Sequence, residues 1–354
     1  MFAVVGYDMA AKDYFVYTYT VMDDETHEFE DFSYTTASYN DQENGVISFE
    51  VPFEVAEYVA DRTAYSEGLK VDQATGEITE YTGTENCVVI PEYMNVGNGD
   101  VVKVTGIKAG AFKNNTTIIA VVLSDFITEI PDNCFAGCSN LSGLIGGEIT
   151  RIGNNAFSGC TSLVDCAVRP TVNFVGENAF NGTERVFFNC ANEEVALAAT
   201  TCGAKKICIY LNYLETPDPM NGKTLDIPVG TEYFELSGGN RTYTDLSIHS
   251  DATETVLNKI NLVSTGSIPF QTSSATVALN QSSIHAVGLA MVLNAEDTAL
   301  ALQSTVSISS ENENAVLCKN VTLSEQSPLV EGKLDVSDNI VLGIEHEEGD
   351  EFLC

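Results

Sequence analysis

Aromatic and aliphatic residues recur along residues 107–180 with a nearly constant spacing. Four phenylalanines stand at Phe112, Phe135, Phe157 and Phe180, and the intervals between them differ by no more than one position. An aliphatic residue stands five places before each phenylalanine, and another stands six places after it. Such a period predicts a solenoid, in which each repeat is one turn of a coil and buries its apolar residues only when the next turn stacks on it.

The residues next to each phenylalanine also repeat. A small residue precedes each aromatic ring, as close packing beside a large side chain requires, and these residues are Ala111, Cys134, Ala156 and Ala179. Two places before the phenylalanine stands Asn133, Asn155 or Asn178, and the first repeat has Gly110 there. We expect these asparagine side chains to cap a short helical turn or to satisfy backbone groups of a turn.

The segments CFAGCSNL (134–141) and AFSGCTSL (156–163), each following an Ile-Pro or Ile-Gly pair, resemble the BspA-type bacterial leucine-rich repeat. The resemblance extends over residues 76–211, beginning with a segment similar to the one that leads into such arrays. It implies a surface-exposed interaction module, exported and part of a larger bacterial surface protein, and it implies no chemistry. The sequence begins without the pattern of a secretory signal.

Each predicted repeat contains one inward-facing strand, so the residues between the inward positions face the exposed, concave side of the coil. Concave faces of solenoids are common binding surfaces. The candidate contact residues are Ala120, Val122, Gly143, Ile145, Asp165, Ala167 and Phe187. Ordinary exposed strand residues would show the same alternation, so this pattern alone does not prove binding.

The chain is predicted to be mainly β, with three parts. Residues 1–67 contain alternating runs such as FAVVGY, YFVYTYTV and GVISFEVPFEV and form a small β unit; residues 68–212 form the repeat domain. Residues 213–354, after the proline-containing YLETPDPMNGK, form a third, all-β domain. Its apolar pairs recur at almost equal intervals at 277, 306 and 334, and it resembles bacterial right-handed β-helix domains that bind carbohydrate. A β-sandwich is the alternative.

The chain carries 51 acidic and 16 basic residues, a formal net charge of −35. This charge repels nucleic acid and anionic lipid, and no apolar run is long enough to insert into a membrane. The acidic run 23–31 offers Asp23, Asp24 and Glu28 to Ca²⁺, but it lacks the calcium-loop spacing, so a solvated loop is the favoured interpretation. No other cofactor is expected. Most of the ten cysteines are predicted to be buried free thiols rather than disulfides or zinc ligands.

Catalytic motifs are missing from the sequence. None of the four histidines lies in a known catalytic motif, and no glycine-rich phosphate loop is present. The preferred interpretation is a non-enzymatic adhesion or ligand-binding protein of the cell surface, with a protein or polysaccharide partner. The alternative is a polysaccharide-active enzyme, a lyase or hydrolase, or its carbohydrate-binding module.

Overall fold

The computed structural model describes residues 2–8, 13–21, 29–37, 66–97, 100–303, 306–311 and 315–323, the first three ranges as backbone. In these N-terminal ranges, β1 (Phe2–Asp8), β2 (Asp13–Val21) and β3 (Phe29–Ala37) form an antiparallel sheet. Strands are thus confirmed for FAVVGY and YFVYTYTV. The run GVISFEVPFEV and the calcium candidates Asp23, Asp24 and Glu28 lie outside the described residues.

A group of short strands leads into the repeats. They are β4 (Leu69–Val71), β5 (Glu77–Tyr81), β6 (Cys87–Ile90), β7 (Tyr93–Asn95), β8 (Val101–Lys103) and β9 (Gly106–Ile107). Strand β4 pairs antiparallel with β5, and β7 with β8. Strand β6 pairs in parallel with the first repeat strand, so the coil begins here.

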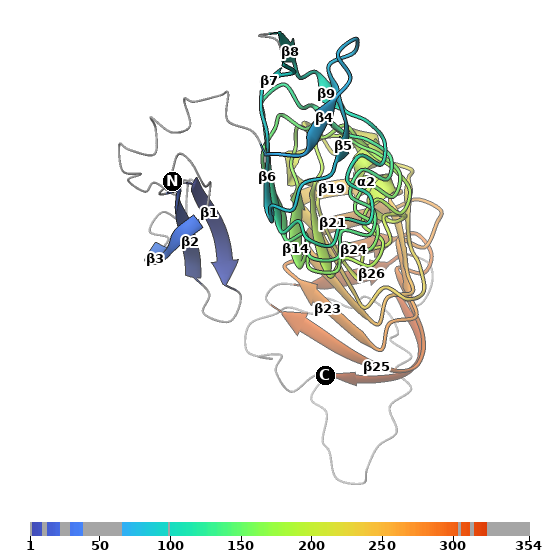
Figure 1. Cartoon of the computed structure of the whole chain (residues 1–354). Helices are drawn as coiled ribbons and strands as arrows, with labels where there is room; N and C mark the ends of the chain where they lie inside the picture. Colours follow the sequence, from blue (N-terminus) through green and yellow to red (C-terminus); the bar gives the residue numbers. More distant parts are fainter. Residues whose placement is uncertain are drawn as a thin grey trace.

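The repeats form turns of a coil, each with strands in parallel register. The elements are β10 (Ala120–Leu123), β11 (Glu129–Ile130), β12 (Gly143–Gly146), β13 (Arg151–Ile152), β14 (Asp165–Val168), β15 (Phe174–Val175), β16 (Arg185–Asn189), α2 (Glu193–Ala199) and β17 (Lys206–Tyr210). Figure 1 shows the turns stacked side by side. The predicted solenoid is confirmed.

The later part of the chain continues as a parallel coil. Its elements are η1 (Leu211–Tyr213), η2 (Asp218–Met220), β18 (Thr224–Ile227), β19 (Tyr233–Thr244), β20 (Ser247–Ser250), β21 (Glu254–Ser264), β22 (Phe270–Thr272), β23 (Thr276–Asn280), β24 (Ser283–Ala286), β25 (Met291–Gln303), β26 (Ser307–Ser310) and β27 (Val316–Leu323). The strands of β18–β27 pair in parallel, whereas a β-sandwich is antiparallel.

The interval predicted between turns in this part is wrong. Val277 pairs with Leu300, and Ile284 pairs with Ile308, so the strand that begins near 277 returns at 300 rather than at 306. The apolar pairs near 277 and 306 lie on different sides of the coil, so the interval between them does not measure one turn. Leu334 and Val336 are outside the described residues.

The coil is continuous in hydrogen bonding where the sequence predicted a domain boundary. Strand β17 pairs with β19 in parallel, from Lys206 opposite Tyr233 to Tyr210 opposite Ser237. The connecting segment is anchored, because Leu214 and Met220 are buried. The division of the chain at residue 212 stays a prediction.

The four repeat phenylalanines form one stack in the core. The centroid of the Phe135 ring is 5.1 Å from that of Phe112 and 5.6 Å from that of Phe157, and Phe157 is 5.4 Å from Phe180. The rings are within 20° of parallel, and none is more than 4 % exposed. The prediction of a continuous aromatic ladder is confirmed.

The repeated asparagines are required by the backbone. Asn133, Asn155 and Asn178 have φ angles of 56°, 53° and 53°, and Gly110, which holds the same place, has 72°. This left-handed region is accessible to glycine and tolerated by asparagine. Glycine has no side chain, so the predicted side-chain cap cannot explain all four positions, whereas the positive φ angle is common to all of them.

The described cysteines are free thiols, and most of them are buried. The Cys138 Sγ donates a hydrogen bond to the Phe112 carbonyl oxygen at 3.0 Å, and Cys160 Sγ donates to the Phe135 carbonyl oxygen at 3.1 Å. Each thiol therefore ties its turn to the preceding one. This confirms the prediction of buried thiols at the repeat positions.

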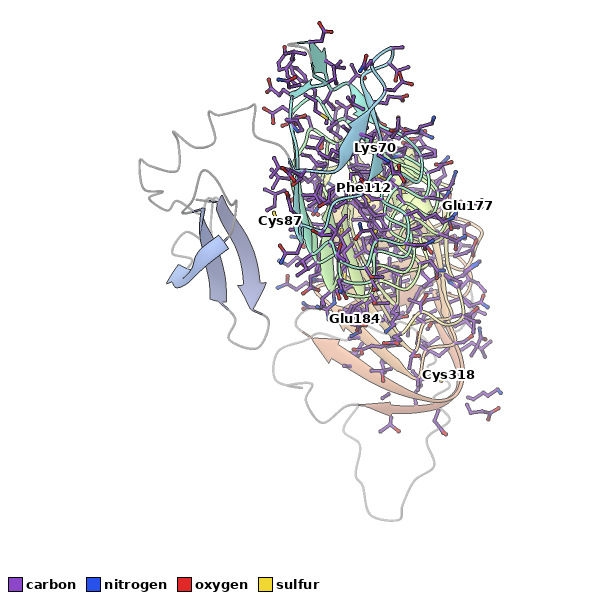
Figure 2. The ribbon with its side chains drawn as sticks, viewed as in Figure 1. Lys70, Cys87, Phe112, Glu177, Glu184 and Cys318 are labelled. Atoms are coloured by element: carbon purple, nitrogen blue, oxygen red, sulfur yellow. The ribbon has the colours of Figure 1, made fainter. Side chains whose placement is uncertain are left out.

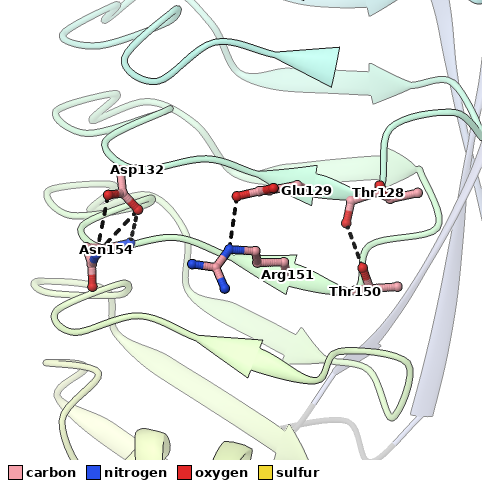
Figure 3. Close-up of polar contacts among 6 residues, drawn as sticks. All are labelled: Thr128, Glu129, Asp132, Thr150, Arg151 and Asn154. Atoms are coloured by element: carbon pink, nitrogen blue, oxygen red, sulfur yellow. Dashed lines mark hydrogen bonds and ion pairs between the residues drawn. The ribbon is translucent and has the colours of Figure 1, made fainter. Parts of the chain in front are cut away.

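Polar side chains connect the turns on the outside of the coil (Figure 3). The Arg151 Nε lies 3.1 Å from Glu129 Oε1, and the Asn154 backbone N–H donates to Asp132 Oδ1 at 2.7 Å. Asn154 Oδ1 accepts from the backbone N–H of Glu177 in the next turn at 2.9 Å. These contacts fix the register of neighbouring turns.

Replacing Phe157 by alanine should lower the free energy of unfolding by about 3–5 kcal/mol, because the change leaves a cavity between two stacked rings. Urea melts would measure it. The control Val164→Ala alters a side chain that is 55 % exposed and should change stability by less than about 0.5 kcal/mol. Equal melts for Phe157→Ala and the parent would contradict the ladder.

Asn155→Ala and Asn155→Gly should have different effects on stability. Alanine at a φ of 53° is expected to cost about 1–2 kcal/mol, since its Cβ approaches the following carbonyl oxygen. Glycine should cost little, because it adopts this conformation freely. Thermal melts of the two variants test this, and a larger loss for glycine than for alanine would show that the amide side chain matters more than the backbone.

Alkaline pH should destabilise the fold through its thiols. Burial raises the pKa of Cys160, Cys190 and Cys202 to about 12, whereas a thiol in the unfolded chain ionises near pH ~8.5. The contribution of these protonated thiols to the free energy of unfolding is complete below pH ~8.5. It is lost as the pH rises further, because the unfolded chain then releases protons that the folded chain keeps. Urea melts at rising pH should lose about 1.4 kcal/mol per pH unit for each such thiol, and Cys160→Ala should have a shallower slope. Identical slopes would contradict this explanation.

Candidate functional site

One surface of the coil is formed by the outward-facing residues of the long strand stack, which we call the strand face. Buried and partly exposed residues alternate along most of these strands; in β16, Val186 and Phe188 are buried, whereas Arg185, Phe187 and Asn189 are partly exposed. The strand face comprises Cys87, Val89, Ala120, Val122, Gly143, Ile145, Asp165, Ala167, Arg185, Phe187, Lys206, Tyr210, Tyr233, Glu235, Glu254 and Val256, together with Cys208, which is in register with them but is buried by its neighbours. Figure 2 shows Cys87 and Glu177 on opposite sides of the coil.

The structure brings the predicted contact residues together in two groups. Strand pairing places Ala120 opposite Gly143 and Val122 opposite Ile145. In the second group, Asp165 is opposite Arg185 and Ala167 is opposite Phe187. No pairing joins β12 to β14 among the described residues, so the two groups belong to separate hydrogen-bonded sheets. All seven predicted residues are at least partly exposed.

The first group is uncharged. Besides the four predicted residues, strand β6 adds Cys87 and Val89, which align with Ala120 and Val122. This part of the strand face is therefore small and apolar, although the protein carries a net charge of −35. An uncharged strip on so acidic a surface is suited to contact with another apolar surface.

The second group contains aromatic and charged residues that sequence reasoning missed. The rings of Phe187 and Tyr210 are 6.4 Å apart and 22° from parallel, and Tyr210 aligns with Asn189, two places after Phe187. Arg185 stands two places before Phe187 in the same strand. Its guanidinium lies 5.8 Å from the Phe187 ring centroid, and its Nη1 lies 3.7 Å from Asp165 Oδ1. Tyr210 and Arg185 are thus both neighbours of the Phe187 ring.

Beyond Tyr210, the next strand adds a carboxylate between polar and aromatic neighbours. The Tyr233 hydroxyl donates to Glu235 Oε2 at 3.0 Å. Glu235 is aligned with Cys208 in the preceding strand. Burial and then the charge of Glu235 raise the pKa of the Cys208 thiol to about 12, and the same two causes raise the pKa of Tyr210 and Tyr233 above their usual range. The thiol and both hydroxyls are therefore neutral at physiological pH.

These residues were missed because the spacing between turns changes there. Phe187 aligns with Cys208, and Cys208 aligns with Glu235, but the second interval in the sequence is longer than the first, since η1 and η2 lengthen the connection. The alternation in KICIY (206–210) and YFELS (233–237) was the available signal, although it could not fix which residues align.

The described residues offer little for metal chemistry. No group of three or more His, Cys, Asp or Glu side chains there is arranged to hold a metal ion. Two described histidines contact other polar side chains. His249 Nδ1 lies 3.0 Å from Asp226 Oδ1. His285 contacts Ser309 Oγ at 2.8 Å and Glu311 Oε1 at 3.4 Å. Likewise, in the described part of the chain no helix has the length and apolar character to cross a membrane.

Comparison with known proteins identifies the repeats. Residues 101–199 match the family described as BspA type leucine rich repeat region, in six copies. No curated protein matches the chain. This match does not extend to the third part of the chain, whose resemblance to carbohydrate-binding β-helix domains stays a prediction.

Solved structures of bacterial repeat proteins are similar to the chain. A leucine-rich repeat protein from Bacteroides capillosus ATCC 29799 is 24 % identical, over 35 % of this chain and 94 % of that one, with a TM-score of 0.29. One from Bacteroides ovatus ATCC 8483 is 13 % identical over 73 % and 88 %, TM-score 0.31. A leucine rich cell surface protein from Faecalibacterium prausnitzii A2-165 is 13 % identical over 74 % and 95 %, TM-score 0.28. Residues 101–199 of the present chain are thus similar to BspA type leucine rich repeats.

Proposed function

We propose that this is a non-enzymatic ligand-binding protein of the bacterial cell surface, with an adhesive role, and that it binds a protein partner through the strand face. The observation that carries the proposal is the alignment of an uncharged apolar strip and an aromatic, charged group on one side of a continuous coil. Extended solenoid faces of this kind bind partners without reactive residues. The match to BspA-type repeats, whose resemblance implies a surface-exposed module, supports an extracellular location.

A protein partner is favoured over a polysaccharide by the geometry of Phe187. Sugar rings bind aromatic residues by lying against an open ring face, yet the Tyr210 ring is stacked beside Phe187 and the Arg185 guanidinium lies near it, which restricts access to its faces. Tryptophan, whose large ring would serve best, is absent from the chain. Ring edges and an apolar strip instead resemble the core and rim of a protein interface.

A hydrolase is the alternative function, and one set of contacts favours it. His285 lies between Ser309 and Glu311, which is the order of groups that activates a serine nucleophile. The His285 and Glu311 side chains are 40 % and 55 % exposed, so water weakens their interaction. Release of reducing ends or of an ester product, abolished by Ser309→Ala, would establish this activity.

The strand face is tested by blocking it. Ala167→Arg places a long cation on an exposed residue of the face, and Ala109→Arg makes the same change in the turn segment that carries Phe112. Linear peptides selected from a random library on the wild-type protein should bind Ala109→Arg equally and Ala167→Arg at least about tenfold more weakly, a loss of about 1.4 kcal/mol.

A glycan array probed with the same three proteins separates the two partner classes. Glycan binding that Ala167→Arg removes, without peptide binding, would replace the protein partner by a polysaccharide. Peptides that bind Ala167→Arg as well as wild type would contradict the role of the strand face.

A further inference from the structure

Glu235 occupies an unusual place on the strand face. It is partly buried near the start of β19, between Cys208 of the preceding strand and Val256 of the following strand. Its Oε2 accepts a hydrogen bond from Tyr233 at 3.0 Å. The Tyr210 side chain belongs to the adjacent strand, two positions after Cys208. The carboxylate therefore lies among two tyrosines and two apolar neighbours.

The cations near Glu235 are engaged elsewhere. Lys206 aligns with Tyr233, but its Nζ lies 2.6 Å from Glu184 Oε1. Arg185 contacts Asp165 and lies near the Phe187 ring. Among the described residues, no lysine, arginine or histidine forms an ion pair with Glu235. A partly buried carboxylate without a counter-charge is costly, because burial removes part of its hydration.

The local potential is negative. Glu254 faces Tyr233 from the next strand, and its charge, with that of Glu235, helps to keep the Tyr233 hydroxyl protonated. The net charge of −35 adds a long-range field that attracts cations. Carboxylates bind ammonium and guanidinium groups by charge-assisted hydrogen bonds, and tyrosine rings add cation–π attraction.

We propose that Glu235, Tyr210 and Tyr233 form a binding site for an organic cation, namely the guanidinium or ammonium group of an arginine or lysine side chain of the partner protein. This rests on the proposed function and names the chemistry of its partner. One carboxylate with two neutral hydroxyls fits a monovalent organic cation, whereas Ca²⁺ requires six to eight oxygen ligands. The apolar strip and this site then recognise two different features of one partner.

The site can be tested without the natural partner. The full chain, with tyrosine rings isotopically labelled, is titrated with N-acetyl-arginine amide, and ring signals are followed by NMR; Tyr210→Phe and Tyr233→Phe assign them. We expect saturable shifts of both ring signals in the wild type. Glu235→Gln should weaken binding at least tenfold. Glu177→Gln, which makes the same charge change on the opposite side of the coil, should leave binding unchanged.

Each other outcome overturns the proposal. Absent shifts, or shifts that persist in Glu235→Gln, exclude the cation site, and equal weakening by Glu177→Gln shows that only net charge acts. Saturation by Ca²⁺ in place of the arginine derivative would show a metal site. If the arginine derivative does not bind but peptides still bind in a way that Ala167→Arg weakens, only the cation site is excluded. If the arginine derivative shifts the tyrosine signals but peptides do not bind, only the proposed partner surface is excluded.

Discussion

The stacking of each turn on the next is the interaction on which this structure depends. A single turn has one phenylalanine and a few aliphatic residues, which is too little apolar surface to fold alone. Phe135 and Phe157 are covered because each lies between the rings of its neighbours. Parallel strand pairing and the thiol-to-carbonyl contacts of Cys138 and Cys160 also connect neighbouring turns, by hydrogen bonds.

Because stacking fixes the inward side chains, the outward ones are free to differ from turn to turn. Strand pairing nevertheless holds them in columns, so a change in one residue alters one place on the surface. The strand face uses this freedom: Val89 and Val122 belong to an apolar strip, and Glu235 lies among tyrosines several turns later. A repeating core can thus carry a surface that does not repeat, as recognition of a specific partner requires.

The sequence predicted what repeats and missed what interrupts the repetition. The phenylalanine ladder and the buried thiols follow from regular spacing, because equivalent positions meet equivalent surroundings. The left-handed φ of Asn155 could have been inferred from its exchange with Gly110. The alignment of Cys208 with Glu235 could not, since η1 and η2 lengthen that turn. The equal intervals after position 277 misled because the coil has several sides, and equal intervals can connect different ones.

The most direct test of mutual support between turns is hydrogen exchange of backbone amides, measured turn by turn under native conditions. Stacked turns that stabilise one another should protect amides most strongly around Phe157 and Phe180, with protection decreasing gradually towards both ends of the coil. Rapid exchange around Phe157, or abrupt boundaries that divide residues 107–180 into independently opening pieces, would contradict the account.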